Sequence, residues 1–173
     1  MSTLKVGTIQ DHANSITAMT IDSSGRILQP AKPAFRARIA TTSGSAGTTG
    51  TLIFETEDFD IGGNYNHTNG IFTAPIAGIY HFMFRSLTAT NTGGGASASN
   101  DTIYVNFYKN GAITDGTSAF ISNRGAEGYS TLMMNTMMQL SASDTIKVVF
   151  GSEHAYHDAS GEYDPCFEGY LVS

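Results

Sequence analysis

The sequence has 173 residues, and several residue types that would define common protein classes are scarce or absent. It contains no tryptophan, four prolines and a single cysteine, Cys166, so no intrachain disulfide can hold the fold. Nine scattered Lys and Arg residues in a chain of net charge −6 cannot form the basic patch that nucleic-acid binding requires. No apolar run is long enough to cross a membrane as a helix, and Met1 to Gly7 lack the apolar centre of a secretion signal. We therefore expect neither nucleic acid nor membrane as a partner.

Long stretches with apolar residues at helical spacing are also missing. Short runs rich in Val, Ile, Phe, Tyr and Thr are separated instead by Gly, Ser, Thr and Asn, which is typical of an all-β protein. The length suits one domain with a short appendage. The expected strands are 34–40, 51–56, 71–74, 78–89, 102–109, 117–122, 128–140, 144–151 and 166–172.

The most informative segment is Gly70 to Phe82, with the sequence GIFTAPIAGIYHF. Apolar residues precede Pro75, which cannot donate a hydrogen bond to a sheet, and an alternating run follows Gly78. The pattern predicts a short strand, a tight corner between Pro75 and Gly78, and a long half-buried strand.

This segment resembles the signature of the complement C1q globular-head family, which shares its jelly roll with the tumour-necrosis-factor cytokines. Three further stretches fit the same family in the same order: Ile61 to Asn66 (IGGNYN), Tyr108 to Gly111 (YKNG) and Phe167 to Leu171 (FEGYL). The resemblance covers residues 34–173. It implies a two-sheet antiparallel jelly roll of about ten strands and assembly into homotrimers.

Residues 1–33 differ from this predicted head and are expected to form a separate arm. Ile16 to Ile21 and Arg26 to Leu28 can pair across Asp22-Ser-Ser-Gly25, a good turn sequence. Such a hairpin buries too little to be stable alone, so we expect the arm to attach the head to another protein. The arm carries a net charge of +1, with three cations against two carboxylates, which leaves −7 for the head. The predicted docking residues are Leu4, Val6, Ile9, Ile16, Met19, Ile21, Ile27 and Leu28.

The arm is also similar to an N-terminal segment of structural proteins from marine tailed bacteriophages. The similarity lies in Lys5 to Asp11 (KVGTIQD) and Met19 to Ile27 (MTIDSSGRI), and continues through Pro30 to Phe35. It implies a virion protein that is assembled in the host cytoplasm without a signal peptide.

Several predicted strands of the head have apolar or aromatic residues on both faces. In the 128–140 strand, Met133 and Met137 lie opposite a face that carries Leu132, Met134, Met138 and Leu140. In the 102–109 strand, Tyr104 and Tyr108 lie opposite Ile103, Val105 and Phe107. A sandwich needs only one apolar face per strand, so the second face indicates subunit contact. The predicted trimer-interface residues are Tyr104, Tyr108, Met133 and Met137.

Two groups of residues could carry chemistry. His154, His157 and Asp158 could bind zinc or another divalent cation, although their spacing matches no specific metal motif and also fits a polar surface loop. The acidic run Glu55, Glu57, Asp58 and Asp60 could supply a carboxylate pair or a calcium site, or could simply form a solvated sheet edge. Cys166 sits among apolar residues, which indicates an inert buried thiol.

The sequence favours a non-enzymatic virion protein without a cofactor, a homotrimeric head attached by residues 1–33. A tail-fibre or tail-appendage tip would adhere to a glycan or protein of the host surface. A capsid decoration trimer is the first alternative, and a metal-dependent glycan-acting enzyme the second. Sequence alone does not decide between tail and capsid.

Overall fold

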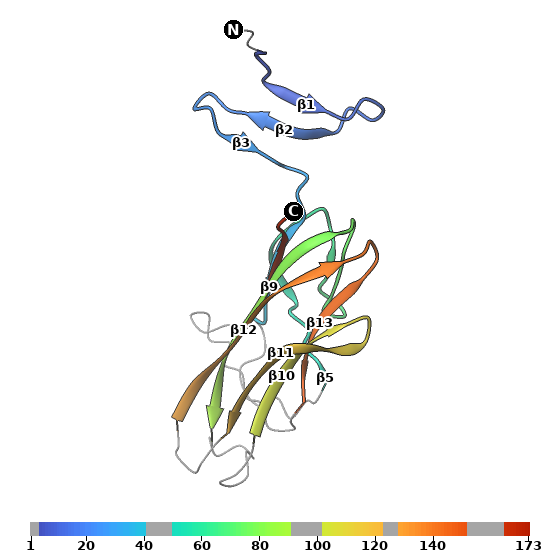
Figure 1. The fold of residues 1–173 in the computed structure, drawn as a ribbon. Helices are drawn as coiled ribbons and strands as arrows, with labels where there is room; N and C mark the ends of the chain where they lie inside the picture. The colour runs from blue at the N-terminus through green and yellow to red at the C-terminus, as the bar shows by residue number, and fades with distance from the viewer. Residues whose placement is uncertain (1–3, 41–49, 91–101, 123–127, 152–164) are drawn as a thin grey trace.

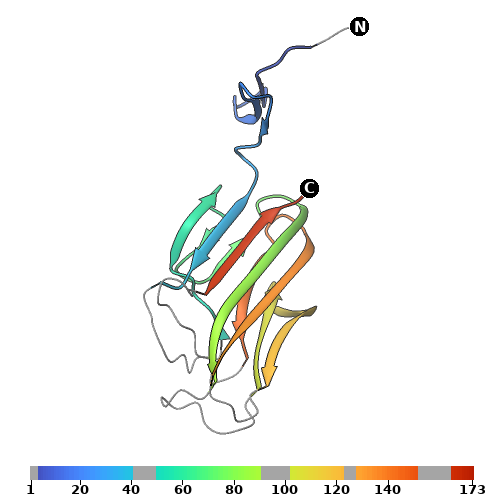
Figure 2. The ribbon, with the colours of Figure 1, turned by 90° about the vertical axis from the view of Figure 1, so that its left-hand side faces the viewer.

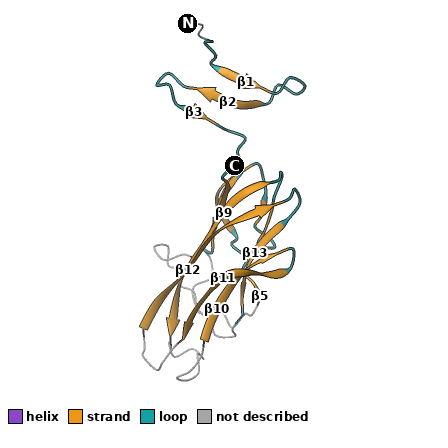
Figure 3. Cartoon of the chain, viewed as in Figure 1, coloured by secondary structure: helices purple, strands orange, loops and turns teal. Residues whose placement is uncertain are grey.

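The computed structural model describes residues 4–40, 50–90, 102–122, 128–151 and 165–173, and all their regular elements are strands (Figures 1 and 3). None of the described segments forms a helix that could cross a membrane. The strands form three antiparallel sheets: a small one in the arm and two that pack face to face in the head (Figure 2).

The first sheet of the head has five strands. Their order is β12 (Gly128–Leu140), β9 (Gly78–Thr90), β14 (Cys166–Leu171), β4 (Ala34–Arg38) and β6 (Thr56–Ile61). The last strand of the chain therefore lies in the centre, between β9 and β4.

The second sheet of the head has six strands. Five lie in the order β11 (Ala112–Ser122), β10 (Thr102–Lys109), β13 (Thr145–Phe150), β8 (Ile71–Thr73) and β7 (Tyr65–Asn66), and β5 (Gly50–Thr51) also pairs with β13. The two sheets form the antiparallel jelly roll that the sequence predicts, with eleven strands in the part of the head that the structure describes.

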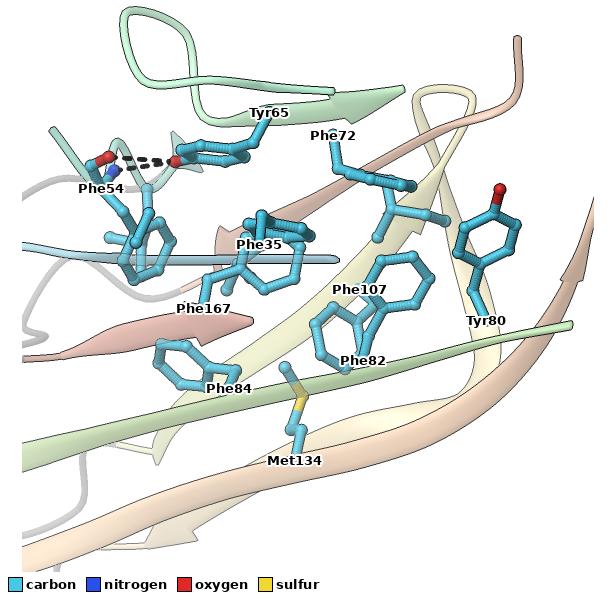
Figure 4. Packing of buried hydrophobic residues seen from close by; sticks show 14 of the residues in the cluster. Phe35, Phe54, Tyr65, Phe72, Tyr80, Phe82, Phe84, Phe107, Met134 and Phe167 are labelled. Atoms are coloured by element: carbon cyan, nitrogen blue, oxygen red, sulfur yellow. Dashed lines mark hydrogen bonds between the residues drawn. The ribbon is translucent and has the colours of Figure 1, made fainter. Parts of the chain in front are cut away.

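Aromatic side chains fill the space between the sheets (Figure 4). The Phe35 ring stacks on Tyr65 and Phe72 at centroid distances of 4.9 and 5.0 Å and meets Phe167 edge-on at 4.9 Å. Tyr65 is the polar member: its hydroxyl accepts from the Phe54 amide at 3.2 Å and donates to the Phe54 carbonyl at 3.3 Å. Because the Tyr65 hydroxyl and both backbone groups of Phe54 are hydrogen-bonded, burying this hydroxyl in the core costs little free energy.

The alternation of buried and exposed residues follows the sequence prediction closely. Tyr80, Phe82 and Phe84 of β9 are fully buried, whereas His81 and Arg85 lie on the other face. The corner predicted at Pro75 to Gly78 is also present, between β8 and β9.

Two strand predictions were wrong in their boundaries, and one strand was not predicted. The strand expected at 51–56 is two strands, β5 and β6; Glu57, Asp58 and Asp60 lie in β6, and Glu55 directly precedes it. β11 begins at Ala112 rather than 117, with a bulge opposite Phe107 and Gly116 at φ +72°. β7 was not expected, because it has only two residues.

The arm forms a three-stranded sheet of β1 (Thr8–Gln10), β2 (Thr17–Ile21) and β3 (Ile27–Leu28). The hairpin predicted across Asp22 to Gly25 is confirmed, with the Asp22 carboxylate accepting from the amides of Ser24 and Arg26. Figure 1 shows this sheet standing beyond the end of the head, next to the C-terminus.

Candidate interaction surfaces

The outer face of the five-stranded sheet can be described as rows of residues that pair across the strands. One row runs Met137, His81, Tyr170, Ala34 and Ile61 from β12 to β6. Met137 is 67 % exposed and Tyr170 49 %, and the His81 and Tyr170 rings lie 5.3 Å apart. This end of the face, which lies toward the arm, is thus largely apolar and uncovered.

The neighbouring rows of the same face carry charge. One of them runs Met133, Arg85, Cys166, Arg38 and Thr56. Arg85 Nε donates to Cys166 Sγ at 3.2 Å, and the thiol is buried, as the sequence indicated. Met133, 54 % exposed, therefore lies in a charged row, and the row of Asn135, Met83, Glu168, Arg36 and Phe59 separates it from the apolar end.

Asp58, in the bulge of β6, forms ion pairs with two arginines of this face. It lies 2.8 Å from Arg38 Nε and 3.4 Å from Arg36 Nε, and Glu168 lies 3.6 Å from Arg36 Nε. These arginines are engaged inside their own chain.

The other carboxylates of the acidic run also have individual partners. Glu55 accepts from the Ala40 amide at 2.9 Å, Asp60 accepts from the Tyr65 amide at 2.9 Å, and Glu57 lies 2.8 Å from His67 Nδ1. β6 is an edge strand, so the structure favours the charged sheet edge over a shared carboxylate site.

The predicted interface residues do not form one surface. Met133 and Met137 lie on the five-stranded sheet, whereas Tyr104 and Tyr108 lie on the outer face of the six-stranded sheet. Tyr104 is 42 % exposed and covers Gly151, where an added Cβ would meet the ring. Lys147 Nζ lies 5.9 Å from the Tyr108 ring centroid.

Sequence reasoning missed Phe120, which pairs with Tyr104 across β11 and β10 and is 71 % exposed. The alternation within the expected strand 117–122 could have placed Phe120 outside. Together, Tyr104 and Phe120 make an exposed aromatic pair on the second sheet.

The predicted docking residues are distributed over the arm on two faces and in the segments beside its strands. Ile9, Met19, Ile21 and Ile27 share one face of the arm sheet, and Leu28 lies on the other. Ile16 precedes β2, and Leu4 and Val6 precede β1. Most of the eight are exposed, Leu4 at 87 % and Ile27 at 63 %.

The possible metal ligands His154, His157 and Asp158 lie outside the residues that the structure describes. Within the described segments, no three His, Cys, Asp or Glu side chains group in a way that could hold a metal ion.

Four of the described groups have clearly shifted pKa values: the pKa is raised for Tyr65 and Tyr80 and lowered for Asp22 and Asp144. Burial raises the pKa of the Tyr65 hydroxyl in the core. The pKa of Asp144 is lowered to about 2, chiefly by a hydrogen bond from Asn110 and also by those from Lys109 and the Ser141 amide.

Two antiparallel sheets around an aromatic core, with the last strand central in one of them, define the class of this protein as a jelly-roll β-sandwich. The C1q domain family model matches residues 34–172, and the chain belongs to this family. It is similar in structure to the globular domain of zebrafish complement 1qA protein, with a TM-score of 0.56 and 14 % sequence identity. That similarity covers 82 % of this chain and 98 % of the zebrafish chain, and at this identity it shows the fold alone. No curated protein sequence matches the chain.

Proposed function

We propose that this protein is a non-enzymatic, homotrimeric head that its N-terminal arm attaches to a bacteriophage virion, where the head adheres to the host surface. The observation that carries the proposal is the arm itself: a small sheet that stands off the head with its apolar side chains exposed. Exposed apolar side chains concentrated on such a small element mark a binding surface rather than ordinary scatter.

Trimerisation is supported by the family membership and by the apolar end of the five-stranded sheet. Met137, Tyr170, Ile61 and Ile79 gather there, with exposures between 39 and 67 %. Methionine and aromatic residues are enriched at the buried centres of interfaces. We expect this face to contribute to the subunit contact.

A binding role rather than catalysis is supported by the carboxylates of β6. Each has a partner within the chain, in an ion pair or a backbone hydrogen bond, and this leaves no evident acid and base pair on that strand. A virion role is supported by the similarity of residues 5–35 to phage structural proteins. A tail appendage is preferred, and a capsid decoration trimer is the alternative.

Truncation before Pro33 tests the role of the arm. We expect the truncated head to remain a folded trimer but to lose attachment to the particle, since among the described residues the hydrogen bonds between arm and head involve Lys32 and Pro33. Sedimentation measures the trimer, and binding to particles that lack the protein measures attachment. A truncated chain that dissociates or unfolds would show that the arm belongs to the head.

The subunit contact is tested separately with the double variant Met133→Lys/Met137→Lys. Two desolvated ammonium groups per copy are costly in an interface, so we expect monomers at micromolar concentration. Ile53→Lys, which changes an exposed isoleucine between β5 and β6, is the matched control and stays trimeric. If the double variant sediments as a trimer, this face is not the contact.

Copy number per particle decides between the two locations. Few copies that co-purify with isolated tails support the appendage, and many copies that remain on tail-less shells support decoration.

A further inference from the structure

The arm sheet has one apolar face and one largely hydroxylic face. Ile9 pairs with Met19 and Ile21 with Ile27, and since residues 19 and 21 point to the same side of β2, all four share a face. The opposite face carries the row Thr8, Thr20 and Leu28. The two faces therefore suit different environments.

Within the part of the chain that the structure describes, the apolar face is left largely exposed. Ile9, Ile21 and Ile27 are 47, 43 and 63 % exposed, and Figures 1 and 2 show the sheet beyond the end of the head. Hydrogen bonds between arm and head come from the connecting segment: Lys32 Nζ donates to the Val172 carbonyl at 2.9 Å, and the Leu171 amide donates to the Pro33 carbonyl at 3.0 Å. Strands of three, five and two residues need a packed face to be stable.

The absence of charge on this face favours other copies of the chain as its cover. A symmetry axis brings identical side chains together, so charged side chains on this face would repel their own copies. The apolar side chains of Ile9, Met19, Ile21 and Ile27 can pack against their copies without such repulsion. The charged residues nearest in sequence, Asp11, Asp22 and Arg26, lie in the turns. Asp22 and Arg26 form an ion pair with each other at 2.7 Å.

The position of the arm in the chain also favours other copies of the chain as the partner of its apolar face. The arm enters the head as β4, a strand of the sheet whose outer face we propose as the subunit contact. The apolar end of that face, with Met137, Tyr170 and Ile61, lies toward the arm. Heads joined there would hold their arms close together, at an effective concentration on the order of millimolar.

We propose that the three arms of a trimer pack their apolar faces, formed by Ile9, Met19, Ile21 and Ile27, against one another around the threefold axis. The resulting short three-sided stalk turns Leu28, the threonine row and the free edges of β1 and β3 outward, where the particle can bind them. This inference rests on the trimer of the proposed function. It assigns half of the predicted docking residues to self-association.

Disulfide trapping in the full chain tests the stalk. Met19→Cys places a thiol on the inner face, and Thr20→Cys, its neighbour on the same strand, places one outside. Because a disulfide needs Cα atoms within about 7 Å, oxidation should link two of the three copies for Met19→Cys and none for Thr20→Cys. Wild-type protein is the negative control, because its single cysteine, Cys166, is buried.

A second full-length variant, Ile9→Asp/Ile21→Asp, separates the stalk from the head contact. We expect it to remain a trimer in sedimentation, held by the heads, and to lose cross-linking when combined with Met19→Cys. If it remains a trimer and Met19→Cys alone does not cross-link, or cross-links no more than Thr20→Cys, the stalk is overturned and a different partner covers the face. If it sediments as a monomer, the head contact of the proposed function fails, whereas cross-linking by Met19→Cys would still support the stalk.

Discussion

Gly169 allows the aromatic core to close around the central strand. A Cβ at this position would lie 2.5 Å from Phe82 Cδ1 and 2.9 Å from Phe35 Cε1, in rings that are themselves packed against other rings. We expect Gly169→Ala to lower the free energy of unfolding by about 1–3 kcal/mol, as overpacked cores do. Gly7→Ala is the control, since nothing lies within 4 Å of its added Cβ. Equal urea midpoints for the two variants would contradict this account.

A second prediction for a single residue concerns the buried hydroxyl of Tyr65. Tyr65→Phe leaves the Phe54 amide and carbonyl unpaired in the core, which should cost about 1–3 kcal/mol at neutral pH. Because burial raises the Tyr65 pKa above its ordinary value of 10.0, the unfolded chain ionises first, and wild type should lose stability as the pH rises past 10. The variant lacks this loss, so the gap between the two proteins should narrow in urea unfolding at pH 11. A constant gap would mean that Tyr65 ionises equally in both states.

Single residues were the most predictable part of the molecule, and their partners the least. Period-two alternation assigned Tyr80, Phe82, Met133 and Met137 to the correct faces, because it follows directly from strand geometry. It could not show that Met137 and Tyr104 lie on different sheets, because that depends on pairing between strands far apart in sequence. The four predicted interface residues therefore lie on two sheets, and their role in a subunit contact stays a prediction.

Among the elements, the turn after β10 is tied to the turn that connects the two sheets between β12 and β13. Asn110, at φ +52°, donates to Asp144 at 2.8 Å and accepts from the Thr145 amide at 2.9 Å, and Lys109 lies 2.9 Å from Asp144. Since the Asp144 pKa falls from 3.8 to about 2 on folding, its stabilisation is complete above pH 4 and is lost between about pH 4 and 2.

The prediction for this turn follows from that window. Asp144→Ala should unfold at lower urea concentration than wild type at pH 6, and the difference should shrink as the pH approaches 2. Asp115→Ala, at an exposed carboxylate of β11, is the control, with a small effect at every pH. A difference for Asp144→Ala that is the same at pH 6 and pH 2 would show that the carboxylate charge does not contribute.

Strands with strong alternation were predictable, and short or acidic strands were not. β10 and β12 were expected with their observed bounds because apolar and polar residues alternate along them. Thr56 to Ile61 carries three carboxylates and has low strand propensity, but it forms a strand because Arg36 and Arg38 of β4 lie against Asp58. Such tertiary compensation leaves no trace in the local sequence.

At the scale of the whole molecule, the two ends of the chain differ in importance. The arm meets the head through a few polar contacts, whereas β14 pairs with both β9 and β4 and supplies Phe167 to the core. We therefore expect removal of residues 166–173 to abolish the fold. Removal of the longer segment before Pro33 should leave the head folded. Amide hydrogen exchange measures both truncations. Protected amides in β9 of the chain that ends at residue 165 would contradict the prediction.

The central position of β14 also has a consequence for biosynthesis. The five-stranded sheet cannot close until its last six residues have left the ribosome, since β9 and β4 are joined only through them. Until then, the apolar inner face of β9 remains open and relies on the translating cell for protection from aggregation. The head can therefore close only after β14 has been synthesised, and a chain stalled before Cys166 would leave this face exposed.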